Sequence, residues 1–75
     1  MDSLIRFVQQ AEQDDELQIR IQQASSASEL VQLAATLGYE LSRDMLRSRS
    51  RDLSATYWPW AGKTNSWRRT WFEAG

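Results

Sequence analysis

The sequence predicts an all-α fold: a small bundle of about four short helices with an aromatic-rich C-terminal extension. Three observations predict it. Apolar residues recur at helical spacing through the first 54 residues, capping residues precede each periodic segment, and six of the eight aromatic residues fall in the last nineteen positions. We therefore expect a helical domain over residues 1–54 and a Trp- and Arg-rich tail over residues 55–75.

The first helix is expected over residues 3–13 and the second from residue 14 to about residue 24. In each segment apolar residues three or four positions apart share one face, and Ile19 lies on a different face of the second helix. Asp2 or Ser3 would cap the first helix. Acids begin the second, where they cap free amides and complement the helix dipole, and they lack the alternating ligands and glycine of a calcium loop. The apolar residues are Leu4, Phe7, Val8 and Ala11, then Leu17, Ile21 and Ala24; the acids are Asp14, Asp15 and Glu16.

A third helix is expected over residues 27–37, between a capping box and a glycine. Ser26 and Glu29 have the spacing at which the hydroxyl accepts from an early helical amide and the carboxylate accepts from the Ser26 amide. Gly38 stands where the chain leaves the helix, so we expect it to adopt a positive φ. The apolar residues of this helix are Leu30, Leu33, Ala34 and Leu37.

A fourth helix is expected over residues 43–53. Ser42 would cap it, and Leu41 would fold onto Leu46 as a hydrophobic staple. Isolated helices shorter than about 12 to 15 residues are marginal in water, so tertiary packing must hold all four. The predicted core consists of Leu4, Phe7, Leu17, Ile21, Leu30, Leu33, Leu37 and Leu46.

The block from Glu29 to Leu46, with Leu4, Phe7, Asp15, Leu17, Ile21 and Ala24 before it, resembles the Nif-eleven-like leader-peptide family. These are small bacterial proteins linked by name to nitrogen fixation, and the resemblance covers roughly the first 54 residues. It implies a helical domain that a peptide-modifying enzyme recognises, with a double-glycine-type site before a core peptide. Other members of the family are freestanding proteins.

The composition argues against an enzyme. The chain has no Cys and no His, so disulfides, thiolate zinc sites and Ser-His or Cys-His nucleophiles are all excluded. Its three glycines are too scattered for a phosphate-binding loop. We expect no catalytic residue, no cofactor and no metal site. No apolar run approaches the about 20 residues needed to span a bilayer, and the N-terminus lacks a signal-peptide pattern, so the expected location is cytoplasmic.

Charge is distributed unevenly along the chain. Residues 1–40 carry two bases and seven acids, 2 − 7 = −5, whereas residues 41–75 carry seven bases and three acids, 7 − 3 = +4. The run from Arg47 to Arg51 is similar to the Arg-Ser repeats of RNA-associated proteins, but the helix dipole also favours bases near a helix C-terminus. Arg47 and Arg51 stand one turn apart and would repel slightly, which leaves room for an acidic partner.

The tail allows three interpretations. Its rings complete a helical core, or they form an exposed Trp and Arg surface for a partner, or Ala61-Gly62 or Ala74-Gly75 acts as a degenerate double-glycine site. Pro59 breaks any helix through the first rings, and Asn65 or Ser66 would cap a short turn that places Trp67 and Trp71 on one side. The candidate partner-binding residues are Tyr57, Trp58, Trp60, Trp67, Arg68, Arg69, Trp71 and Phe72.

The sequence thus predicts a non-enzymatic protein-interaction module, either a leader-like recognition element or a freestanding adaptor, whose partner is a protein such as a peptide-modifying enzyme. The alternative is a nucleic-acid-binding module that combines the Trp rings with the bases of the C-terminal half. Those bases are Arg47, Arg49, Arg51, Lys63, Arg68 and Arg69.

Overall fold

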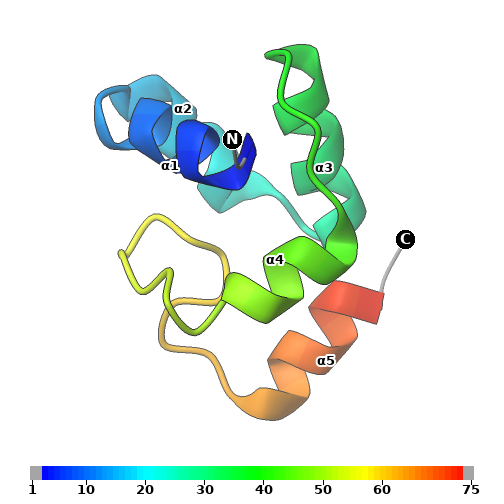
Figure 1. Ribbon diagram of the computed structural model, residues 1–75. Coiled ribbons are helices and arrows are strands. Elements are labelled where there is room, and N and C mark those ends of the chain that lie inside the picture. Colours follow the sequence, from blue (N-terminus) through cyan, green and yellow to red (C-terminus); the bar gives the residue numbers. More distant parts are fainter. Residues whose placement is uncertain (1–2, 74–75) are drawn as a thin grey trace.

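The computed structural model describes residues 3–73, and this part of the chain contains five helices and no strand (Figure 1). The all-α prediction is confirmed. The helices are α1 (Ser3–Glu12), α2 (Asp15–Gln23), α3 (Ala27–Thr36), α4 (Arg43–Arg49) and α5 (Asn65–Glu73). The count is five because the turn expected after residue 64 is a nine-residue helix.

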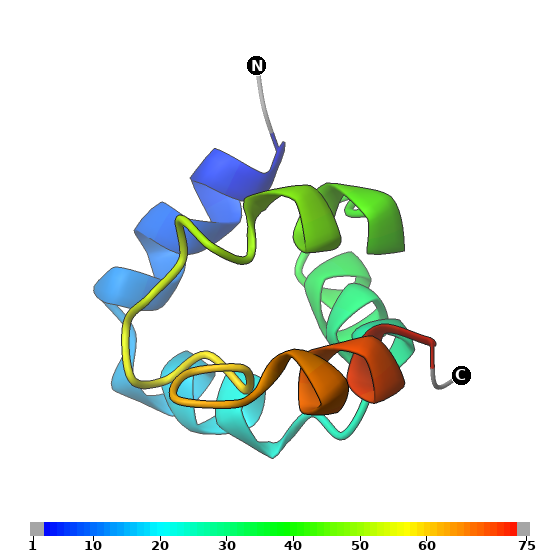
Figure 2. The ribbon, with the colours of Figure 1, turned by 90° about the horizontal axis from the view of Figure 1, so that it is seen from below.

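The helices and the connection between α4 and α5 form a ring, which is clearest when the molecule is seen from below (Figure 2). Helix α1 packs on α2, α2 on α3, and α3 on both α4 and α5. Buried side chains from all five helices and from the α4–α5 connection fill the interior. No helix within residues 3–73 has the length and hydropathy needed to cross a membrane.

The first three helices begin much as their sequences predict. Helix α1 buries Leu4, Phe7 and Ala11, and the predicted cap at Asp2 lies outside the described residues. The Asp14 carboxylate caps α2 by accepting a 3.2 Å hydrogen bond from the Leu17 amide.

The capping box of α3 differs from the prediction in one detail. The Ser26 hydroxyl accepts from the Glu29 amide at 3.3 Å, as expected. The Glu29 carboxylate, however, accepts from the hydroxyl and from the amide (2.6 Å) of Ser25, one residue before the cap. These hydrogen bonds stabilise the charged form and lower the pKa of Glu29, with a smaller contribution from the Ser26 amide.

The C-terminus of α3 is a Schellman motif. The Tyr39 amide donates to the Ala34 carbonyl at 2.9 Å and the Gly38 amide donates to the Ala35 carbonyl at 3.0 Å, the two bonds that define this motif. Gly38 has a φ of 89°, so the predicted positive φ is confirmed. Leu37 is the C-cap and 39% exposed, so its assignment to the core was wrong. At this end, where the chain leaves the helix, the side of α3 that carries Leu37 faces solvent.

Gly38→Ala is expected to destabilise the chain by about 1 to 2 kcal/mol, the cost of a left-handed conformation for a residue with a Cβ. A Cβ at this position would meet no atom within 4 Å, so backbone strain alone sets the cost. Urea unfolding followed by circular dichroism measures the change. Gly38→Asn is the matched variant and should lose less, because Asn enters this conformation more readily. Equal midpoints for wild type and Gly38→Ala would contradict the role of the motif.

Helix α4 is shorter than predicted, ending at Arg49 instead of residue 53. Its cap is as expected: the Ser42 hydroxyl accepts from the Met45 amide at 3.1 Å, and Leu41 and Leu46 are both buried, as a staple requires. The helix ends where the Ser50 side chain bonds back to it. The Ser50 hydroxyl donates back to the Arg47 carbonyl at 3.0 Å, a bond that competes with continuation of the helix.

Four aromatic residues of the C-terminal segment lie inside the ring. Trp58, Trp60, Trp71 and Phe72 are each at most 3% exposed. The rings of Trp58 and Trp60 stack with centroids 5.2 Å apart, and Trp71 meets Trp60 edge-on at 5.4 Å. The Trp60 indole N–H donates to the Leu53 carbonyl at 2.7 Å, and that of Trp71 donates to the Ala24 carbonyl at 3.2 Å. The indole N–H groups of Trp60 and Trp71 therefore both have hydrogen-bond partners.

Candidate functional site

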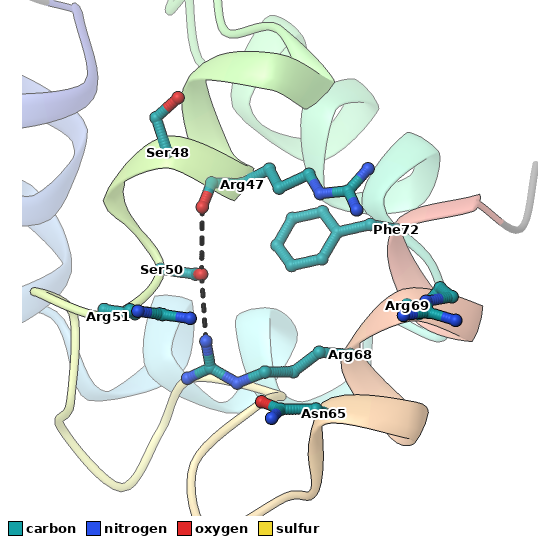
Figure 3. A pocket seen from close by; sticks show the side chains of 8 residues that line it. All are labelled: Arg47, Ser48, Ser50, Arg51, Asn65, Arg68, Arg69 and Phe72. Atoms are coloured by element: carbon teal, nitrogen blue, oxygen red, sulfur yellow. Dashed lines mark hydrogen bonds between the residues drawn. The ribbon is translucent and has the colours of Figure 1, made fainter.

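A concave surface lined by several arginines lies between α4 and α5, and we call it the arginine pocket (Figure 3). It is open to solvent, has a volume of about 580 Å³, and carries four arginines and no acid. The residues that line it are Arg47, Ser48, Ser50, Arg51, Asn65, Arg68, Arg69 and Phe72.

Helices α4 and α5 both pack on α3, and this brings the two halves of the arginine pocket together. Helix α5 begins with Thr64 as its cap, instead of the predicted Asn65 or Ser66, because the Thr64 hydroxyl accepts from the Trp67 amide at 3.2 Å. Trp71 and Phe72 then face the core, which leaves Arg68 and Arg69 toward the pocket. At the far end the Arg43 guanidinium donates to the Phe72 carbonyl at 3.5 Å and joins the two helices.

Ser50 connects the two sides of the pocket. Its hydroxyl donates to the Arg47 carbonyl at 3.0 Å and accepts from the Arg68 guanidinium at 3.1 Å (Figure 3). Ser50 is only 4% exposed, and one hydroxyl can both donate and accept, so these bonds fix the Arg68 side chain against the end of α4. The sequence analysis missed Ser50; its position inside the Arg-Ser run was the only signal.

Apart from Arg68, which binds Ser50, the pocket contains three guanidiniums, and these have no ionic partner within the described residues. Within residues 3–73 no carboxylate lies within 4 Å of the Arg47, Arg51 or Arg69 guanidinium, whereas Arg20 on α2 pairs with Glu16 at 3.3 Å. Four like charges around one concavity raise the local positive potential and attract anions. A guanidinium also presents paired N–H donors that match a carboxylate or a phosphate group. The arginine pocket is therefore suited to bind an anion.

The structure separates the candidate partner-binding residues into two groups. Trp58, Trp60, Trp71 and Phe72 are buried in the core. Tyr57, Trp67 and Arg68 are half-buried and Arg69 is exposed. Only this second group reaches the surface, and Arg68 and Arg69 are the two that line the arginine pocket.

Tyr57 offers little to a partner, because its hydroxyl is buried. Burial, together with the charge of Glu12, raises the pKa of the Tyr57 phenol. Trp67 is covered on one side by Lys63, whose ammonium lies 5.5 Å from the ring centroid.

The bases of the predicted nucleic-acid surface do not gather in one place. Arg47, Arg51, Arg68 and Arg69 line the arginine pocket, and Lys63 lies over Trp67. Arg49 lies instead in a hollow of about 150 Å³ against α1, beside apolar side chains and Asp52. Among the described residues no group of three or more His, Cys, Asp or Glu is placed to hold a metal ion.

A family model described as the Nif11 domain matches residues 1–44 of the 75. The match covers α1, α2, α3 and the start of α4, and every residue of the arginine pocket lies beyond it. No curated protein and no solved structure matches the chain.

Proposed function

The chain belongs to the Nif11 domain family, and from this premise we propose that it is a small, non-enzymatic protein-interaction module. It acts as a leader-like recognition element or as a freestanding adaptor, and its partner is a protein such as a peptide-modifying enzyme. The proposal includes a bacterial cytoplasmic location, because a chain without Cys needs no oxidising compartment.

The observation that carries this proposal is the arginine pocket. Desolvated charged residues fix orientation and specificity in protein interfaces, and Arg is enriched at the positions that contribute most to binding. Here four arginines from α4, the residues just after it and α5 stand around one concavity, and none of the four has an acidic partner within residues 3–73. Such an arrangement contributes little to the stability of the fold and is suited to a binding surface.

The unit that a partner meets includes α5. Trp71 and Phe72 belong to the core, so cleavage after Gly62 would remove two buried rings together with Arg68 and Arg69. We therefore disfavour Gly62 as a processing site within the folded chain. The other candidate, Ala74-Gly75, lies outside the described residues.

The test is titration calorimetry of the full chain against a peptide-modifying enzyme encoded beside its gene. We expect saturable binding that the double variant Arg47→Gln/Arg51→Gln weakens. Arg6→Gln is the matched control, since Arg6 is an exposed arginine on α1, away from the arginine pocket, and it should leave the affinity unchanged. Absence of binding, or equal effects of the two variants, would count against a partner surface on α4 and α5.

The second candidate function, nucleic-acid binding, is favoured by the same pocket because phosphates also pair with guanidinium groups. Salt separates the two candidates. Binding through several phosphates weakens steeply and log-linearly with salt, with a slope of about −0.7 per phosphate for single strands. A protein interface with an apolar component changes less. The buried Trp58, Trp60 and Trp71 rings cannot stack on bases, which favours the protein partner.

A further inference from the structure

We propose that the arginine pocket binds a short acidic peptide segment, with consecutive Asp or Glu side chains, on the partner protein. This inference rests on the proposed function and names the chemistry of its recognition site. It concerns residues beyond the part of the chain that the family model matches.

The first argument is charge complementarity in a confined space. The guanidiniums of Arg47, Arg51, Arg68 and Arg69 share one open cavity of about 580 Å³, within the range of about 300 to 1,000 Å³ typical of sites for small ligands. Two or three neighbouring carboxylates would meet several guanidiniums at once. Each would replace the repulsion among the arginines by an ion pair with paired hydrogen bonds.

The second argument is that part of the pocket is preorganised. Ser50 holds the Arg68 guanidinium at 3.1 Å, and the bond from Arg43 to the Phe72 carbonyl ties α5 to α4. Side chains and helices that are already fixed lose less conformational freedom when a ligand binds. Arg47, Arg51 and Arg69 complete the site from its exposed sides.

The third argument distinguishes a short acidic segment from a nucleic acid. A long polyanion would extend past the pocket toward residues 1–40, which carry a net charge of −5. The acidic junction of α1 and α2 lies on the opposite side of the molecule from α5 (Figures 1 and 2). A short segment meets only the basic side. Moreover, Arg49 and Lys63, which a strand would need along its path, lie in other environments.

The experiment measures binding of a fluorescein-labelled hexaglutamate peptide to the full 75-residue chain by fluorescence anisotropy. Hexaglutamine serves as the uncharged control peptide. We expect hexaglutamate to bind and hexaglutamine not to bind. Arg47→Gln/Arg51→Gln should weaken binding at least about tenfold, because two of four charges are lost, while Arg6→Gln should stay within about twofold. Neither Arg47 nor Arg51 uses its guanidinium in a hydrogen bond within the described residues, so both variants should fold, and circular dichroism checks that they do.

Four outcomes would overturn the inference. Equal weakening by the double variant and by Arg6→Gln would place hexaglutamate elsewhere. Tighter binding of a single-stranded oligothymidylate with the same number of charges would assign the pocket to nucleic acid. A salt-sensitive dimer in sedimentation, lost in the double variant, would make the acidic turn over residues 12–16 of a second copy the occupant. If hexaglutamate fails to bind while the modifying enzyme binds, the acidic-segment inference fails and the proposed function stands.

Discussion

Truncation of the chain after Ser54 is expected to abolish cooperative folding. It removes Trp58, Trp60, Trp71 and Phe72, all buried, and with them the hydrogen bond to the Ala24 carbonyl. Each large aromatic residue buries about 150 to 250 Å², which is about 3 kcal/mol or more of transfer free energy. A chain of this size has a net stability of only about 3 to 5 kcal/mol. The loss therefore exceeds the stability several times over.

Thermal melting followed by far-ultraviolet circular dichroism tests this expectation. The truncated chain should show little helix and no cooperative transition. A chain shortened after Glu73 is the matched control, because it keeps every residue that the structure describes and should melt as the full chain does. A cooperative transition of the 54-residue fragment at the full-length temperature would show that the helices form a core without the rings.

Helix caps and helix ends that depend on a single turn of the chain could be predicted from the sequence. The caps at Ser26 and Ser42 and the stop at Gly38 depend on a side chain and on amides or carbonyls a few residues away, so their geometry follows from local spacing. The end of α4 was misjudged because Ser50 also accepts a hydrogen bond from Arg68, eighteen residues further along the chain. Helical periodicity contains no information about that contact.

The arginine pocket could be predicted only in part for the same reason. Arg47 and Arg51 were visible as a like-charged pair open to an acidic partner, and Arg68 and Arg69 as bases among aromatic residues. Their meeting around one cavity depends on how α5 packs, and the burial of Trp71 sets that packing. Composition alone could not separate buried rings from exposed ones, because a Trp serves both a core and an interface.

Trp60→Ala is expected to cost about 3 to 5 kcal/mol, the largest effect of any single substitution considered. The Trp60 side chain is 1% exposed. Its ring stacks on those of Trp58 and Phe72, with ring centroids 5.2 Å and 5.7 Å apart. Removal of the Trp60 indole would leave a cavity between these rings, and the Leu53 carbonyl would lose its 2.7 Å hydrogen bond. The protein should be largely unfolded at 25 °C, since the cost is close to its whole expected stability.

Urea unfolding followed by circular dichroism, with two matched variants, separates the ring from its hydrogen bond. Trp60→Phe keeps an aromatic ring but not the N–H donor, so it should fall between wild type and Trp60→Ala. Trp67→Ala removes the same side chain from a half-buried position where it contacts Trp71 at 6.0 Å, and it should cost clearly less. If Trp60→Ala and Trp67→Ala shift the midpoint equally, Trp60 is not central to the core. Side chains other than Trp60 would then have to hold α5, and with it the arginine pocket, in position.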